Sequence, residues 1–233
     1  MRLVKYLAHA GVASRRRSET LIASGVVTVG GQVVTDPARD VDEESGVEVE
    51  GEPVRPEPRE VWILNKPLDV ISTAREPGSR QAVTDLVPSH RRLYPVGRLD
   101  ADSTGLILLT NDGELANRLT HPRYGVERTY RATLRKPPTD AQLARLRNGV
   151  ELDDGPARGA RVRRSGKRGI EITLREGRNR QVRRMAEAIG NEVVSLKRVR
   201  FGSLVLGRLP EGDARKLSAG QLESLWKDAG SDQ

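Results

Sequence analysis

The side chains best suited to chemistry lie in one loop of this chain. Arg98, Asp100 and Asp102 fall between Gly97 and Gly105, whose missing β-carbons allow close backbone approach. Taken alone, two aspartates at this spacing are most often turn residues or solvated charges. They could also bind a metal ion, although supporting ligands are lacking, or one could act as a nucleophile or base. The last role requires a guanidinium from elsewhere in the chain to keep the carboxylate ionised.

The composition excludes several other kinds of catalytic centre. The chain has 233 residues and no cysteine, so it cannot contain disulfides, thiolate nucleophiles, Cys-ligated zinc or iron–sulfur clusters. Its three histidines, His9, His90 and His121, are scattered along the sequence, which argues against a His-rich metal site. We therefore expect neither a metal ion nor a cofactor.

The densest positive charge lies in residues 161–200, which carry thirteen basic and four acidic side chains, whereas the whole chain has a net charge of +8. Such an excess is typical of proteins that bind nucleic acid. Apolar residues recur there at helical spacing and predict a helix ending at Gly190: Val182, Met185, Ala186 and Ile189. The preceding loop contains Arg178 and Arg180 and predicts either a phosphate-binding surface or a passive scaffold.

The first 50 residues predict a small basic module. Helical spacing over residues 3–10 indicates one helix, and Ser14 is a suitable N-cap for a second helix that ends before Gly25. Two β-branched runs separated by a pair of glycines predict a hairpin over residues 26–34. Three arginines lie on or beside the second helix: Arg15, Arg16 and Arg17. By themselves they would indicate only a solvated helix face.

An acidic stretch separates this module from the rest of the chain. Residues 41–60 carry eight acidic and two basic side chains, and their three prolines favour extended backbone. We therefore expect a first domain over residues 1–50, a linker over 51–59 and a second domain over 60–229, with residues 230–233 frayed.

The second domain is predicted to contain both strands and helices. Strands are expected at 61–64, 106–109 and within 193–206, and helices are expected at 114–119, capped by Asn111 or Asp112, and after Ser218. The longest aliphatic run is far shorter than the roughly 20 residues of a membrane-spanning helix. The N-terminal charge order is wrong for a secretory signal, so we expect a cytoplasmic protein that does not enter a membrane.

The N-terminal string AGVASRRRSETLIASGVVTVGGQVV resembles the S4-type RNA-binding domain. Members of that family present basic side chains from two helices and a hairpin to RNA. The resemblance therefore implies that Arg15, Arg16 and Arg17 contact RNA. Val26 and Gly30 stand where many members have Arg and Asn, which predicts a weaker RNA-contacting surface at the hairpin.

Four further strings, LNKP, GRLDADSTGLILLTNDG, ERTYRATL and EGRNRQVRRM, occur in this order. Together they resemble the rRNA pseudouridine synthases of the RsuA/RluB/RluE/RluF branch, most closely its RluB-like members. The resemblance implies that Asp100 is the catalytic aspartate and that Tyr130 stacks on the target base. It also implies that Arg183 pairs with Asp100.

The same resemblance implies roles for further residues. Val182 matches an aliphatic side chain that lines the pocket, and Arg98 matches the side chain that enters the gap left by an extruded nucleotide. Lys66 belongs to the KP motif and is expected among the RNA-binding residues, with Arg178 and Arg180. Asp69 stands where the family usually has glycine. Arg180 replaces the histidine of RsuA-type proteins, which favours a large-subunit target.

The implied activity is the isomerisation of a specific uridine in ribosomal RNA to pseudouridine. The expected substrate is 23S rRNA or a pre-50S particle, and the expected enzyme is a monomer. The implied fold is α+β, with a small S4-like α+β module and a catalytic domain built on a mostly antiparallel mixed sheet with flanking helices. The residues leave one alternative open, a non-catalytic RNA-binding or ribosome-assembly protein in which Asp100 is incidental.

Overall fold

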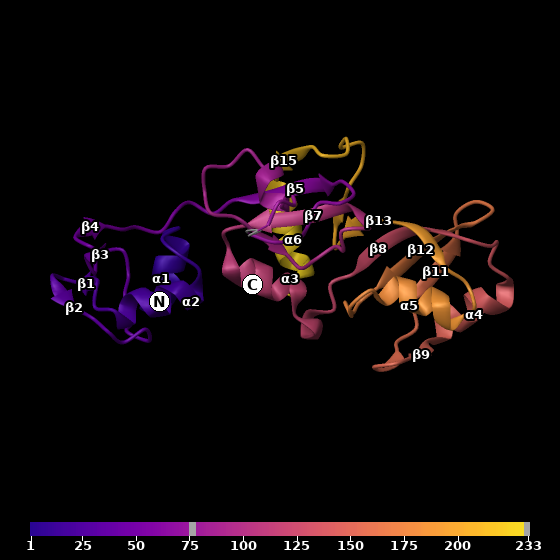
Figure 1. Cartoon of the computed structure of the whole chain (residues 1–233), viewed down its shortest axis with the longest axis horizontal. Helices are drawn as coiled ribbons and strands as arrows, with labels where there is room; N and C mark the ends of the chain where they lie inside the picture. Colours follow the sequence, from indigo (N-terminus) through magenta and orange to yellow (C-terminus); the bar gives the residue numbers. More distant parts are fainter. Residues whose placement is uncertain (75–77, 231–233) are drawn as a thin grey trace. The chain divides into compact units, whose positions relative to one another are not determined.

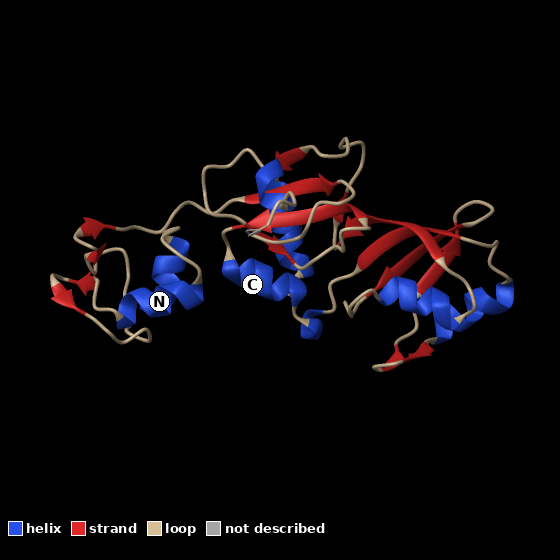
Figure 2. Ribbon diagram, in the orientation of Figure 1, coloured by secondary structure: helices blue, strands red, loops and turns tan. Residues whose placement is uncertain are grey.

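The computed structural model describes residues 1–74 and 78–230, which form two compact units (Figure 1). The first unit is Met1–Glu60 together with two short segments, Ser89–Arg92 and Asn111–Gly113. The second unit holds the other described residues and most of the strands (Figure 2).

The first unit contains the two helices and the hairpin expected for the N-terminal module, and two further strands extend the hairpin to a four-stranded sheet. Ser14 caps the second helix by accepting a hydrogen bond from Arg17 N. Gly30 and Gly31 have φ angles of +58° and +77°, which a two-residue hairpin turn requires. The elements are α1 (Leu3–His9), α2 (Arg15–Ala23), β1 (Val27–Val29), β2 (Gln32–Val33), β3 (Val47–Val49) and β4 (Glu52–Pro53), and the strand order is β2-β1-β3-β4.

The segment expected to be a linker belongs to this unit. Strand β4 lies within it and pairs with β3 at the edge of the sheet, where the missing N–H of Pro53 is tolerated. Two main-chain hydrogen bonds then continue the attachment, from Val54 N to Val47 O at 3.0 Å and from Glu57 N to His9 O at 3.0 Å. The segment predicted as a linker over residues 51–59 is thus part of the first unit, and Pro53 lies on an edge strand where no N–H donor is needed.

The second unit is built on one nine-stranded mixed sheet, which confirms the expected α+β class. Its order is β11-β12-β8-β13-β7-β5-β15, with β14 paired to β13 and β6 to β7, and β13 and β7 form its parallel pair. The strands are β5 (Val61–Lys66), β6 (Tyr94–Val96), β7 (Thr104–Thr110), β8 (Arg128–Leu134), β11 (Arg161–Arg164), β12 (Gly169–Leu174), β13 (Val193–Phe201), β14 (Leu204–Val205) and β15 (Ala214–Lys216). A separate hairpin pairs β9 (Val150–Leu152) with β10 (Gly155–Ala157).

Four helices accompany this sheet: α3 (Gly113–Thr120), α4 (Asp140–Asn148), α5 (Gln181–Ala188) and α6 (Ala219–Asp228). Helices α4 and α5 share one apolar core with β8, β12 and β13, whereas α3 and α6 share another with β5 and β7. The capping box of Ser218 and Gln221 at α6 is confirmed. Asn111 has a different role from the one expected, because its Oδ1 accepts a hydrogen bond from Glu60 N at 2.8 Å.

Two remaining expectations concern the membrane and the C-terminus. No helix among the described residues is long and apolar enough to cross a bilayer. Of the four residues expected to fray, Gly230 still donates a hydrogen bond to Lys227 O at 3.1 Å. Residues 231–233 lie outside the described residues.

Candidate active site

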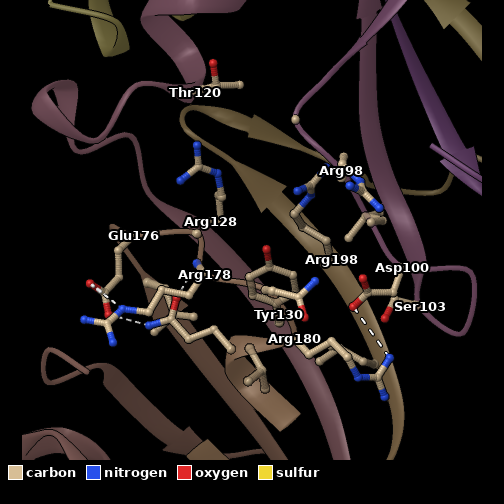
Figure 3. Close-up of a pocket in the computed structure, with 18 of the residues that line it drawn as sticks. Arg98, Asp100, Ser103, Thr120, Arg128, Tyr130, Glu176, Arg178, Arg180 and Arg198 are labelled. Carbon is tan, nitrogen blue, oxygen red and sulfur yellow. Dashed lines mark hydrogen bonds and ion pairs between the residues drawn. The ribbon is translucent and has the colours of Figure 1, made fainter. Parts of the chain in front are cut away.

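A cavity of about 390 Å³ lies in the second unit, in the size range of small-ligand sites (Figure 3). Its wall combines the loop before β7, strands β8 and β13, and the basic loop that leads into α5. Six of the residues expected at the site line it: Arg98, Asp100, Tyr130, Arg178, Arg180 and Val182.

Hydrogen bonds connect the loop that carries Asp100 to the end of β5 and the segment that follows it. Lys66 is fully buried, and its Nζ donates hydrogen bonds to Val70 O at 2.7 Å, Pro67 O at 2.8 Å and Ala101 O at 3.4 Å. Asp69 adds a main-chain bond from its N to Ala101 O at 2.9 Å. With a φ of +61°, Asp69 adopts the left-handed backbone for which glycine is favoured.

Lys66 is therefore a positioning residue, and the expectation that it contacts RNA is wrong. An ammonium group with no exposed surface and three carbonyl partners cannot reach a phosphate without breaking the loop. The KP motif predicts a turn after β5, but it does not reveal on which side of the backbone the lysine lies.

This burial predicts a pH-dependent contribution to stability. Burial lowers the pKa of Lys66 from 10.5 to about 8, although the negative charges of Asp69, Asp100 and Asp102 oppose the shift. Between these two pH values the unfolded chain binds a proton that the folded chain lacks. The free energy of unfolding should therefore rise with pH across this window, by up to about 3 kcal/mol. Urea unfolding at pH 7.5, 9 and 10.5 should show this rise in the wild type and not in Lys66→Met; equal pH profiles would contradict it.

The cationic partner of Asp100 is Arg180. Its Nη1 lies 3.9 Å from Asp100 Oδ2 and 3.1 Å from Asp102 Oδ2, so one guanidinium serves both aspartates (Figure 3). Arg180 is the residue before α5 and has a φ of +48°, a strained value for an arginine, which fits a functional site.

Arg183 does not form the ion pair expected with Asp100. Its Nη2 lies 3.2 Å from Asp102 Oδ2 and donates to Asp102 O at 2.9 Å, and its Nη1 donates to Val193 O at 2.9 Å. The Arg183 side chain is 10% exposed. The residue follows Val182, which takes the helix position that lines the cavity. Arg183 therefore fixes the loop next to Asp100 and ties it to the start of β13.

Tyr130 and two aliphatic side chains form the apolar part of the wall. Tyr130 lies on β8, opposite Ile172 of β12 and Arg198 of β13, and Val182 and Leu196 also line the cavity. The Tyr130 hydroxyl forms no hydrogen bond with any described residue, so the ring is held by packing alone. A planar aromatic group beside a carboxylate is suited to a flat ligand such as a nucleobase.

Arg98 and Arg178 line the cavity in different ways. Arg98 is exposed and has no side-chain partner among the described residues, so it is available to a ligand. The guanidinium of Arg178 is occupied by the β9–β10 hairpin, where it bonds Asp154 Oδ1 at 3.2 Å and Gly155 O at 2.8 Å. Contact of Arg178 with RNA would require these bonds to break.

Comparison with known proteins identifies the family. The model of the RNA pseudouridylate synthase family matches residues 60–188, and that of the S4 domain matches residues 1–49. The chain belongs to the RNA pseudouridylate synthase family. It is 45% identical to ribosomal large subunit pseudouridine synthase B of Bacillus subtilis, over 96% of this chain and 95% of that protein. It is 40% identical to the protein of the same name from Vibrio cholerae, over 96% of this chain and 74% of that one.

A solved structure supports the same conclusion. The crystal structure of a pseudouridylate synthase superimposes with a TM-score of 0.71 at 30% identity, covering 97% of this chain and 99% of that one. The chain is therefore an RNA pseudouridine synthase, an isomerase that converts uridine to pseudouridine, with an N-terminal S4 domain.

The sequence interpretation missed several residues of the synthase cavity: Ser103, Arg128, Arg175, Leu196 and Arg198. A signal existed for the last two, because residues two apart on a strand face the same side and β13 places Leu196 and Arg198 together on the cavity wall. Arg128 and Arg175 carried no such signal. Their place depends on how β8 and β12 pair, which the sequence alone does not specify.

The S4 domain of the synthase displays its three arginines to solvent. Arg15, Arg16 and Arg17 form the first turn of α2, and all three are exposed. No acidic side chain among the described residues pairs with them. Cations at a helix N-terminus are unfavourable to the helix dipole, so these arginines do not serve the stability of α2.

Proposed function

We propose that this synthase isomerises a specific uridine of large-subunit ribosomal RNA, with Asp100 as the catalytic carboxylate. The observation that carries the proposal is the placement of Asp100 and Tyr130 in one cavity, with Arg180 paired to the carboxylate. The substrate class is supported by the relatives from Bacillus subtilis and Vibrio cholerae, which are named for the large ribosomal subunit.

The reaction exchanges one glycosidic bond for another. The bond between ribose C1′ and uracil N1 breaks, the base turns within the cavity, and C1′ bonds to C5. The hydrogen of C5 leaves as a proton and N1 gains a proton, so the product is an isomer of the substrate. Asp100 acts on the ribose, either as a nucleophile at C1′ or as a base toward a ribose proton. Arg180 offsets the negative charge of this carboxylate and orients it in the cavity.

The uridine must leave its stack to reach Asp100. Unstacking costs a few kcal/mol and is least costly in loops and unpaired regions. Tyr130 offsets part of this cost by stacking on the base, and the unpaired, exposed Arg98 fills the gap left in the RNA.

Two substitutions of Tyr130 separate the ring from its hydroxyl. Tyr130→Phe should change kcat/KM by less than about threefold, because the hydroxyl has no described protein partner. Tyr130→Ala should lower it by about 10- to 100-fold, which corresponds to the loss of roughly 1–3 kcal/mol of stacking. Both are measured as tritium released from [5-³H]uridine-labelled RNA. A severe loss in Tyr130→Phe would instead assign a chemical role to the hydroxyl.

The exposed arginines of α2 should contribute to RNA binding. Replacement of Arg15, Arg16 and Arg17 by glutamine should weaken RNA binding and reduce the slope of log K against log salt by about 2–3, because each phosphate contact releases about one counterion. The thermal midpoint should not fall, since these side chains make no described ion pairs. An unchanged salt slope would exclude this helix face as a phosphate contact; Lys227→Gln, on the exposed side of α6, is the matched control.

Two further proposals concern the cellular location and the oligomeric state of the enzyme. Bacterial ribosomal RNA is made and modified in the cytoplasm, so we place the synthase there. We also propose that the synthase acts as a monomer. Free 23S RNA and a pre-50S particle are to be compared directly as substrates, by the rate of tritium release from each.

The substrate class is tested by mapping pseudouridines in ribosomal RNA. Cells that lack the gene should lose pseudouridine at one large-subunit site, and re-expression of the wild-type chain should restore it. Re-expression of Asp100→Asn should not. Loss confined to small-subunit or transfer RNA would overturn the proposed substrate, and no loss at any position would overturn the proposed function in these cells.

A further inference from the structure

Two arginines in the cavity wall share an aromatic support. Arg198 lies on β13 and is 2% exposed, and Arg128 is the first residue of β8. The guanidinium carbon of each lies 5.1 Å from the centre of the Phe201 ring. Figure 3 shows both beside Tyr130, with Arg180 on the other side of the ring in this view.

Neither of these guanidinium groups is neutralised by a carboxylate in the described part of the chain. Arg198 donates from Nε to Leu106 O at 2.7 Å, whereas its Nη2 is buried and has no hydrogen-bond partner. Arg128 donates from Nη2 to Leu119 O at 2.8 Å. Two full positive charges therefore stand at the cavity with only carbonyl oxygens to offset them.

Three other arginines of the cavity have acidic partners. Arg175 lies 3.1 Å from Glu127, Arg178 lies 3.2 Å from Asp154, and Arg180 lies 3.1 Å from Asp102. The cavity arginines without an acidic partner in the described chain are Arg98, which is exposed, and the pair Arg128 and Arg198, which lies against Phe201.

The lack of an acidic partner for Arg128 and Arg198 is energetically unfavourable. A buried cation without a partner costs several kcal/mol, and an unmade hydrogen bond of a buried donor adds about 1–3 kcal/mol. Burial lowers the pKa of Arg128, and the positive charge of Arg198 adds to this effect. An anion bound between the two groups would relieve both costs, whereas a neutral uracil carbonyl would satisfy one donor and leave the charges.

We propose that Arg128 and Arg198 form a subsite for a phosphodiester group of the nucleotide in the cavity, with Arg198 Nη2 as a donor. The proposal rests on the family's activity, which brings a nucleotide of RNA into this cavity. The planar guanidinium matches the geometry of phosphate oxygens, and a charge-assisted bond of this kind is about twice as strong as a neutral one.

Mononucleotides test the subsite in the full-length chain. Dissociation constants for uridine, uridine 3′-phosphate and uridine 5′-phosphate are measured by NMR titration for the wild type, Arg198→Gln and Arg163→Gln. Arg163 is an exposed arginine of β11 that pairs with Glu171 outside the cavity, and serves as the control. At least one nucleotide should bind the wild type and the control about tenfold more tightly than uridine. This advantage should fall to about twofold or less in Arg198→Gln, with the affinity for uridine unchanged.

Either of two results would overturn the proposal. The first is that neither nucleotide binds the wild type more tightly than uridine, including the case in which no ligand binds. The second is that Arg198→Gln weakens uridine as much as the nucleotides, which would assign the guanidinium to the base or ribose. Arg128→Gln, at a less buried position, should reduce the phosphate preference independently and replaces Arg198→Gln if that variant does not fold. Because the ligands are mononucleotides, the result does not depend on whether large-subunit RNA is the substrate.

Discussion

Asp100→Asn should abolish isomerisation while leaving RNA affinity within about twofold of the wild type. The amide keeps the size of the side chain but removes the negative charge and the nucleophilic or basic oxygen on which the reaction depends. Single-turnover release of tritium from [5-³H]uridine-labelled RNA should fall by at least about four orders of magnitude. Binding should change little because phosphate contacts elsewhere on the protein dominate affinity.

Asp102→Asn is the matched control for this prediction. Asp102 lies in the same loop, bears the same charge and shares Arg180 with Asp100, but its carboxylate also meets Arg183 at 3.2 Å. The bond from Arg183 Nη2 to the main-chain Asp102 O survives the substitution, so the loop should keep its place. We expect a loss of about tenfold, equivalent to roughly 1.4 kcal/mol. Equal losses of isomerisation rate in the two variants would contradict the assignment of Asp100 as the catalytic carboxylate.

Gly105→Ala should destabilise the synthase and disturb the cavity together. Gly105 has a φ of +103°, and a β-carbon there would lie 2.8 Å from Arg198 N and closer still to Arg198 O. These contacts occur where β7 and β13 form their parallel pair, so neither backbone can move aside without breaking the sheet. The free energy of unfolding should fall by about 3 kcal/mol or more, which lowers the thermal midpoint by roughly 6–12 °C.

Gly166→Ala separates the clash from the backbone strain. Gly166 has a φ of +92°, and a β-carbon added there would meet no heavy atom within 4 Å, so only the unfavourable dihedral remains. Its cost should be about 1 kcal/mol. A thermal midpoint for Gly105→Ala as high as that of Gly166→Ala would contradict the predicted clash. It would show that the close approach of β7 and β13 leaves room for a β-carbon at residue 105.

Local elements of this protein could be predicted from sequence because their signals are local. Ser14 and the pair Ser218–Gln221 mark helix starts, and the glycine pair at residues 30–31 marks a hairpin. The segment predicted as a linker belongs to the first unit for a physical reason. Prolines favour extended backbone, and an edge strand uses extended backbone as readily as a linker does.

The partners of the site residues could not be predicted in the same way. Asp100 and Tyr130 both line the cavity, yet the resemblance gave Arg183 as the partner of Asp100 where the structure has Arg180. Three arginines lie within five residues at the start of α5, and only the helix rotation and the backbone of Arg180 decide which guanidinium reaches which carboxylate. Arg198 was not predicted as a cavity residue because its position depends on the pairing of β13 with both β7 and β8.

The most direct test of the central claim is the stoichiometry of tritium release by the wild-type chain. Unmodified [5-³H]uridine-labelled large-subunit RNA is incubated with excess enzyme, beside small-subunit RNA labelled in the same way. We predict release that stops at one equivalent per large-subunit RNA molecule and no release from small-subunit RNA. No release from either RNA, by a chain that binds both, would contradict catalysis by Asp100 and leave only an RNA-binding protein.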